Sequence, residues 1–183
     1  MVASSTAEQD RRLLAGAAQG DKRAMHALYQ RHHDALFAFI RMRCDDDALA
    51  ADVVQDAMME VWRCAGRFAG RSSVKTWIFA IARNKMLDRL RKSSQLSFTD
   101  DVPEEVDESP DAVSVIAASQ DASLLRDCLN KLKKVQLAVI RLAFFDELPY
   151  AEIAEIEGVP LGTVKTRIFH AKSALLHCLG GRD

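Results

Sequence analysis

Residues 95–117 contain seven acidic residues and no basic residue, and this segment divides the chain more sharply than any other feature. The surrounding run, SSQLSFTDDVPEEVDESPDAVS, has two prolines, many short polar residues and no helical spacing of apolar side chains. A segment of this composition buries too little apolar surface to offset the entropy lost on ordering. We therefore expect a flexible acidic linker at 95–117, between a domain at 1–94 and a second domain at 118–183.

Both flanking segments have the apolar spacing of three and four residues that is typical of amphipathic helices. No alternating strand pattern of useful length is present. In the first segment, helices are expected after Asp21, through DDDALAADVVQDAMMEVWR, and from about Ser73 through VKTWIFAIARNKMLDRLRK. In that third helix we expect a buried face made of Val74, Trp77, Ile78, Ile81, Ala82, Met86 and Leu90. The predicted fold is all-α, with two small helical domains, the second of which contains a helix-turn-helix.

The charge is unevenly distributed along the chain. Residues 1–94 hold 16 Lys and Arg against 11 Asp and Glu, and residues 118–183 hold 9 against 8. Two mildly basic modules joined by an acidic segment indicate a polyanionic partner. No apolar run is long enough for a membrane span, and MVASSTAEQDRR lacks a signal-peptide core, so we expect a cytoplasmic protein without membrane insertion.

The four cysteines, Cys44, Cys64, Cys128 and Cys178, are scattered, without C-x-x-C or paired histidine spacing. We predict reduced, partly buried thiols in place of a metal site or a disulfide framework.

No nucleophile–base pair, metal cluster or phosphate-binding loop is recognisable. The sequence therefore predicts no catalytic residue, no metal, no cofactor and no enzymatic activity.

Residues 150–179 contain two helix-like runs separated by Gly158-Val159-Pro160. Pro149 suits a first-turn position, and Gly158 can end the first helix in a left-handed conformation. The second run has no carboxylate, as expected of a helix that presents donors to the major groove. Its outward residues are predicted to be Thr163, Lys165, Thr166, Arg167, Phe169 and His170. The alternative is an ordinary solvated basic face, and His170 fits either a DNA contact or the rim.

The first domain offers two further candidate surfaces. Asp52, Gln55 and Asp56 lie on the helix face opposite Val54, Met58 and Val61, which taken alone is a solvated polar face. In the next helix Lys75, Phe79 and Arg83 are spaced by four, which predicts an exposed strip with an aromatic ring between two cations. Such a strip suits single-stranded or locally opened DNA. Ser72, Ser73, Thr76 and Asn84 lie nearby. The alternative places Phe79 in the core, and Trp77 fits a core position better than a base contact.

These motifs occur in an order that resembles a known family. D-x-x-Q-D at Asp52–Asp56 is followed by Trp62, by TWIFAIARNKMLDRLR, by an acidic gap and by EIAEIEGVPLGTVKTRIFHAKSAL. From about Gly20 to Leu179 the chain resembles the bacterial RNA polymerase sigma factors of the extracytoplasmic-function (ECF, group 4) class.

The resemblance implies a transcription initiation factor that binds core polymerase, directs it to −35/−10 promoters and promotes their melting. It implies contacts of Asp52, Gln55, Asp56 and Trp62 with the β′ clamp helices, and of the second domain with the β flap. It implies that a loop around Gly70–Ser73 receives a flipped base of the −10 element. The implied −10 residues are Phe68, Ser72, Ser73, Lys75, Trp77, Phe79, Arg83 and Asn84. The outward residues of the last helix would read the −35 element, the acidic linker would thread the polymerase cleft, and an anti-sigma factor is a further expected partner.

The sequence departs from the family pattern at four places. Leu132-Lys133 and Gln136-Leu137 stand where Leu-Pro and Gln-Arg are usual, and Pro149 stands where serine is common. His170 replaces a more usual arginine or other base, and it lacks the bidentate guanidinium fork. This last change bears on −35 base preference.

Two other functions compete with this interpretation. One is a conventional helix-turn-helix regulator, in which 1–94 form a helical sensor or dimerisation module. The other is an interaction protein that mimics a sigma factor and sequesters an inhibitor. Only the polymerase-binding hypothesis requires a role for Asp52, Gln55 and Asp56.

Overall fold

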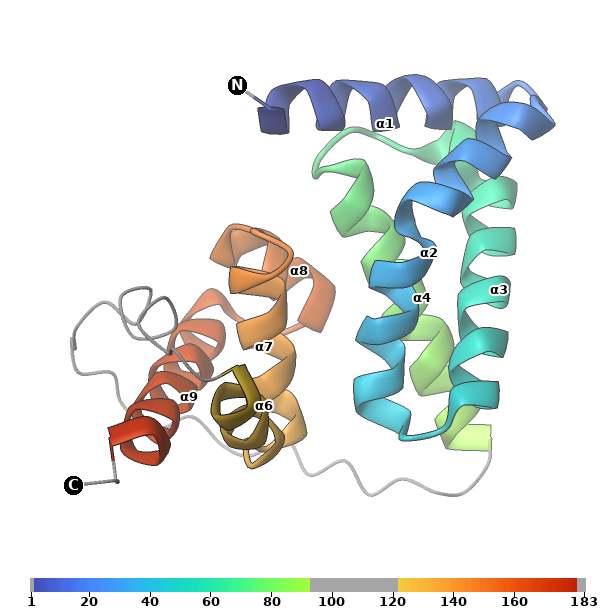
Figure 1. The fold of residues 1–183 in the computed structure, drawn as a ribbon. Coiled ribbons are helices and arrows are strands. Elements are labelled where there is room, and N and C mark those ends of the chain that lie inside the picture. The colour runs from blue at the N-terminus through green and yellow to red at the C-terminus, as the bar shows by residue number, and fades with distance from the viewer. Residues whose placement is uncertain (1, 93–121, 181–183) are drawn as a thin grey trace. The chain divides into compact units, whose positions relative to one another are not determined.

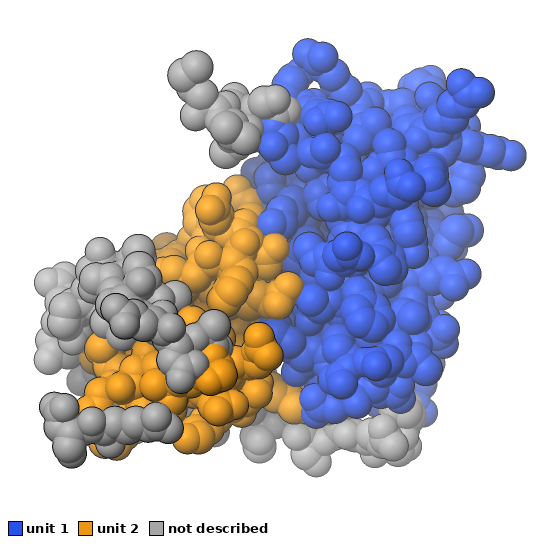
Figure 2. Space-filling model, in the orientation of Figure 1, with its two compact units in different colours: residues 1–99, 155–158 blue, residues 100–154, 159–183 orange. Residues whose placement is uncertain are grey.

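The computed structural model describes residues 2–92 and 122–180, and within these ranges every regular element is a helix. The predicted linker at 95–117 lies outside the described residues. The described residues form two compact units, 2–92 with 155–158 and 122–154 with 159–180 (Figure 2). Two all-α units confirm the predicted fold class.

Unit 1 contains α1 (Val2–Ala18), α2 (Lys22–Cys44), α3 (Asp47–Cys64), a short 3₁₀ turn (Ala65–Arg67) and α4 (Val74–Lys92). Helices α2, α3 and α4 run side by side, and α1 crosses one end of them (Figure 1). Asp21 caps α2 as predicted, because its Oδ1 accepts hydrogen bonds from the backbone N–H groups of Arg23, at 2.8 Å, and Ala24, at 3.3 Å. Helix α1 was not predicted individually from the sequence.

Each helix of unit 1 contributes one apolar stripe to a shared core. The fully buried members include Leu28, Leu36 and Ile40 of α2, Val53, Val54 and Val61 of α3, and Ile78, Ala82 and Met86 of α4. Close packing also limits α1, because a Cβ added at Gly16 would lie 2.8 Å from the Cβ of Ala24. Only glycine permits this approach of α1 to α2.

The predicted exposure of Phe79 is wrong. Its side chain is 0% exposed, and its ring centroid lies 5.0 Å from that of Phe39 on α2. Trp77 and Ile81, which we predicted to be buried, are only half-buried. Residues two apart on a helix point in nearly opposite directions, so Phe79 and Trp77 cannot both lie in the middle of the buried face. Phe79 is the buried residue because its ring packs on that of Phe39. The periodicity of α4 alone does not reveal this contact.

Unit 2 contains α6 (Ala122–Asn130), α7 (Lys134–Phe144), most of α8 (Tyr150–Glu157) and α9 (Leu161–Gly180). The last three residues of α8, 155–157, are grouped with unit 1. Helix α9 packs against both α7 and α6. Its buried residues Val164, Ile168 and Leu175 meet a core that also includes Val139, Ile140, Leu142 and Ile153. The side-chain oxygen of Gln136 accepts a hydrogen bond from the Lys133 N–H at 3.2 Å, so the chain caps α7 despite its departure from the family pattern there.

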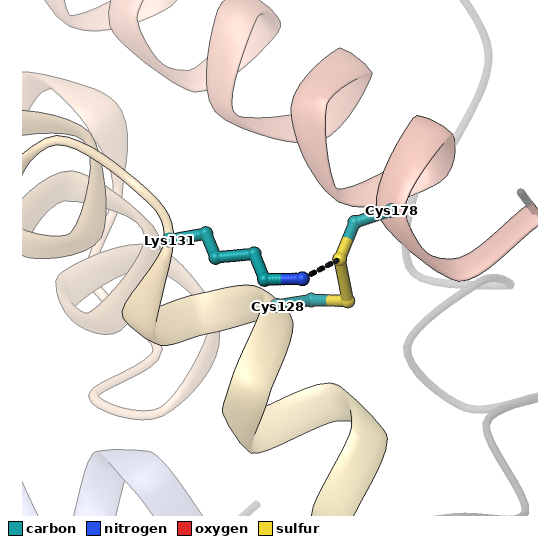
Figure 3. Close-up of a disulfide and its surroundings, with 3 residues drawn as sticks. All are labelled: Cys128, Lys131 and Cys178. Carbon is teal, nitrogen blue, oxygen red and sulfur yellow. Dashed lines mark hydrogen bonds between the residues drawn. A yellow bond between two sulfur atoms is a disulfide. The ribbon is translucent and has the colours of Figure 1, made fainter.

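Two of the four cysteines form a disulfide, which contradicts the prediction of reduced thiols. Cys128 of α6 and Cys178 of α9 are bonded with their Cα atoms 5.9 Å apart (Figure 3). Their separation of 50 positions carried no spacing signal, and only the packing of α6 on α9 brings them together. Cys44 and Cys64 are free thiols and are partly exposed.

Replacing Phe79 by alanine should lower the free energy of unfolding of the protein by about 3–5 kcal/mol, because it removes a fully buried aromatic ring. Met59→Ala is the matched control, since Met59 lies on the same core bundle but is 50% exposed. Chemical denaturation followed by circular dichroism measures both changes. An equal, small effect of the two substitutions would contradict a core role for Phe79.

Candidate functional site

The polar face of α3 is tied to α4 by one arginine. Arg89 donates to Asp56 Oδ2 from Nε at 2.8 Å and from Nη2 at 2.6 Å, and from Nη1 to Asp52 Oδ2 at 3.0 Å. The hydrogen bond to Asp56 raises the pKa of the Arg89 guanidinium above its usual value. The side chains of Asp52 and Asp56 nevertheless remain 61% and 45% exposed, and Gln55 is exposed beside them. The predicted outward face is therefore present, with its carboxylates held in place.

An apolar pocket adjoins this face on unit 1. It has a volume of about 290 Å³ and is lined by residues of α2 and α3: Lys22, Met25, His26, Tyr29, Gln55, Met58, Met59 and Trp62. Gln55 belongs both to the polar face and to the pocket wall, and Trp62 lines the same pocket. A half-buried tryptophan beside an exposed methionine is the kind of surface on which protein partners anchor.

Sequence reasoning missed Arg89 as an individual residue. Nothing local in the sequence connects Arg89 to carboxylates more than 30 positions earlier, so spacing could not reveal its contacts. Cys64, also in α3, donates to Glu60 Oε1 at 3.2 Å. This hydrogen bond raises the pKa of the Cys64 thiol and so disfavours its reactive thiolate.

The start of α4 brings together most of the predicted −10 residues. Ser73 Oγ accepts a hydrogen bond from the Thr76 N–H at 3.1 Å and so satisfies a donor of the first turn. Gly70, in the preceding loop, has φ +68°, a left-handed conformation suited to glycine. Phe68 and Trp77 are both half-buried, with ring centroids 5.2 Å apart.

The remaining −10 candidates lie around this aromatic pair and along α4. Ser72, Ser73, Lys75 and Arg83 are partly exposed, and Asn84 is exposed. The Nζ of Lys75 lies 5.7 Å from the ring centroid of Phe79, which itself lies inside the core. The strip of cations thus exists, but its accessible aromatic rings belong to Phe68 and Trp77.

Helices α8 and α9 form the predicted helix-turn-helix. Gly158 has φ +61° and ends α8 in the left-handed conformation, after which Val159 and Pro160 lead into α9. Across Leu161–Gly180 the sequence has no acidic residue. The turn and the acid-free helix were both readable from the sequence.

The first three turns of α9 carry the predicted −35 residues. Lys165 is exposed, and Thr163, Arg167, Phe169 and His170 are partly exposed, with the last two rings 5.5 Å apart. Thr166 is a correction to the prediction. It is only 8% exposed, and its hydroxyl donates to the Gly162 carbonyl oxygen at 3.1 Å. A threonine hydroxyl that bonds back to its own helix is not presented to a ligand.

Within residues 2–92 and 122–180, no three His, Cys, Asp or Glu side chains gather into a potential metal site. No helix in the same ranges is long and apolar enough to cross a membrane.

Comparison with known proteins identifies the family. Residues 28–95 match Sigma-70 region 2, and residues 122–175 match Sigma-70, region 4. The chain is 36% identical over 153 residues to the ECF RNA polymerase sigma factor RpoE of Cereibacter sphaeroides, covering 81% of this chain and 82% of that protein. The chain belongs to the ECF RNA polymerase sigma factors.

Solved structures agree with this assignment. The sigma factor resembles CnrH in its complex with the cytosolic domain of CnrY, with a TM-score of 0.64, 26% identity and coverage of 96% of this chain and 99% of that chain. It also resembles RpoE in complex with the anti-sigma factor NepR from Bartonella quintana, with a TM-score of 0.59, 27% identity and coverage of 85% and 96%.

This sigma factor is therefore a transcription initiation factor, whose partners are core RNA polymerase and promoter DNA. The competing hypothesis of a conventional regulator with a helical sensor domain is not favoured, because residues 28–95 match a sigma region.

Proposed function

We propose that this sigma factor divides its task among three surfaces: the polar face of α3 binds core polymerase, the start of α4 opens the −10 element, and α9 reads the −35 element. The domains act as 1–94 and 118–183, and the acidic linker 95–117 occupies the positively charged polymerase cleft. The factor works in the cytoplasm, alongside the polymerase, and carries no catalytic activity of its own. The observation that carries the proposal is the acid-free α9 that begins directly after the left-handed Gly158 turn.

The proposed core-binding surface joins charged and apolar parts. Arg89 orients the carboxylate oxygens of Asp52 and Asp56 without covering them. Gln55 lies between these carboxylates and the pocket, which Trp62 also lines. A partly exposed acidic pair suits cationic side chains of the β′ clamp helices, since charge complementarity speeds encounter and fixes orientation. The adjoining pocket can take an apolar side chain of the same partner.

The proposed opening surface replaces Phe79 with the Phe68–Trp77 pair. These rings lie beside the Gly70–Ser73 loop, and Lys75, Arg83 and Asn84 supply charge and hydrogen bonds along α4. An aromatic ring can stack on an unpaired base, which is worth about 1–3 kcal/mol per base. That energy is enough to help hold a few opened base pairs.

An anti-sigma factor is part of the proposal. The two solved relatives described above are complexes with the cytosolic domain of CnrY and with the anti-sigma factor NepR. A control protein of this kind would act on the present chain by covering surfaces that the polymerase also needs.

The core-binding surface predicts that Asp52→Ala/Gln55→Ala/Asp56→Ala weakens association with core polymerase at least tenfold, about 1.4 kcal/mol. Asp34→Ala is the control, because its side chain on α2 is fully exposed and lies outside the proposed surface. Competition binding against the unchanged protein measures both variants. Equal affinity of the triple variant and the control would remove α3 from the interface.

The −35 surface predicts that Arg167→Ala and Lys165→Ala weaken holoenzyme binding to a promoter duplex. A side chain that contacts phosphate should also reduce the salt dependence of binding by about one unit of slope in log–log form. Thr166→Val is the matched control, since its hydroxyl is used within the helix. Binding titrations at several salt concentrations test this, and a loss for Thr166→Val as large as for Arg167→Ala would contradict the assigned face.

The opening surface predicts that Trp77→Ala slows formation of the open complex while duplex binding by the holoenzyme persists. Permanganate reactivity of unpaired thymines in the −10 element reports the open bubble directly. Isoleucine at position 81, half-buried on the same helix, provides the control substitution Ile81→Ala. Unchanged bubble reactivity in Trp77→Ala would assign strand opening to other residues.

A further inference from the structure

Helix α6 is attached to the rest of unit 2 in an unusual way. Between Ser123 and Asn130 its only buried side chain is that of Cys128, which is 1% exposed and bonded to Cys178. Its leucines, Leu124, Leu125 and Leu129, are each only half-buried. The single fully buried contact of this helix is therefore also its covalent bond to α9.

A helix of this length depends on such an attachment. Helix α6 has 9 residues, fewer than the roughly 12–15 that an isolated helix needs to be even marginally stable in water. The disulfide spans 50 positions of sequence and so encloses α7, α8 and most of α9 in one covalent loop. Removing it takes away both the covalent closure of the loop and the link that holds α6 in place.

The bond is also open to chemistry at one of its sulfurs. Cys178 is partly exposed near the end of α9, whereas Cys128 is covered. The ammonium group of Lys131 lies 3.9 Å from the Cys178 Sγ (Figure 3). A neighbouring cation stabilises the Cys178 thiolate, which is released when a mixed disulfide on Cys178 is resolved and which acts as the nucleophile when the bond re-forms.

We propose that Cys128–Cys178 is a reversible redox site that controls the docking of α6 on α9. A dithiol reductant acts through its thiolate, which attacks the Cys178 Sγ and breaks the disulfide. The bonding electron pair leaves on Cys128 Sγ, which is then protonated. The second thiol of the reductant resolves the mixed disulfide, so the products are two cysteine thiols and one oxidised reductant.

Re-formation of the bond needs a two-electron oxidant of the peroxide class. The Cys178 thiolate attacks the peroxide oxygen and becomes a sulfenic acid, releasing water or an alcohol. The Cys128 thiol then condenses with the sulfenic acid, which re-forms the disulfide and releases a molecule of water. The covered position of Cys128 makes it the resolving partner in this direction.

Because α9 is the proposed −35 reading helix, reduction of the disulfide should also affect DNA binding; this step rests on the proposed function. The same helix carries Lys165 and Arg167 near its start and Cys178 near its end, and it packs on α6 and α7. When the bond is reduced, α6 leaves its place, α9 loses part of its support, and the −35 surface becomes less well ordered before binding. Reduction then weakens duplex binding, because part of the binding free energy is used to order the helix.

The first test measures α6 itself in the full chain. Cys44→Ser/Cys64→Ser leaves the bonded pair as the only cysteines, and amide hydrogen exchange is compared before and after dithiothreitol. We expect exchange across Ala122–Asn130 to rise at least about tenfold on reduction, with residues 22–64 unchanged, because exchange reports the free energy of local opening. The additional substitution Cys178→Ser should give the fast rate without reductant and should not respond to it.

Two outcomes of this test overturn the redox site. Equal exchange of α6 in the oxidised and reduced protein would show that the bond does not control its docking. A disulfide that resists millimolar reduced glutathione and a dithiol protein of the thioredoxin class would be a permanent structural bond.

The second test separates the redox site from the proposed function. Binding of holoenzyme to a −35/−10 duplex is measured with the oxidised and the reduced chain, and the oxidised form should bind several-fold more tightly. If α6 responds but neither form binds promoter DNA, the proposed function fails and the redox site stands. If α6 responds and both forms bind equally, the link from α6 to DNA reading is overturned.

Discussion

Burial of Phe79 against Phe39 decides which side of α4 is available to a partner. Once this ring is inside the bundle, the helix can rotate no further, and Trp77, Lys75 and Arg83 must lie toward its partly exposed sides. The same packing places Arg89 within reach of Asp52 and Asp56 on α3. Core packing in unit 1 thus fixes the geometry of both proposed surfaces, the acidic face for the polymerase and the aromatic pair for opened DNA.

In unit 2 the proposed DNA-reading surface is likewise positioned by packing, here together with a disulfide bond. Helix α9 is both a core element and the proposed reading helix, so its apolar stripe and its cationic side are two faces of one structure. A helix that serves both purposes must be well supported by its neighbours. The support comes from α7 through apolar contacts and from α6, which is bonded to α9 through Cys128.

Features encoded locally were predictable from the sequence. Periodicity indicated α2, α3, α4, α8 and α9 and the all-α class, Asp21 was recognisable as a cap, and Gly158 was recognisable as part of the turn inside the helix-turn-helix. The ordered motifs also led to the family. These features depend on a few neighbouring residues, so spacing and residue type were sufficient.

The errors all involve contacts between distant segments or competition within a helix turn. Periodicity placed Trp77 inside and Phe79 outside, because α4 alone does not reveal Phe39 opposite it. Thr166 looked like a DNA contact, but its hydroxyl found a closer acceptor in the Gly162 carbonyl. The pairing of Cys128 with Cys178 depends on how α6 lies on α9, for which no spacing rule exists.

We propose that the two units together select a promoter with two separated elements and deliver the polymerase to it. The decisive measurement is transcription in vitro from a library of randomised promoters, with core polymerase and this chain. We expect the transcribed templates to share two short sequence elements at a constant spacing, which core polymerase alone does not enrich. Templates without any shared element, or no transcription beyond that of core polymerase, would contradict it.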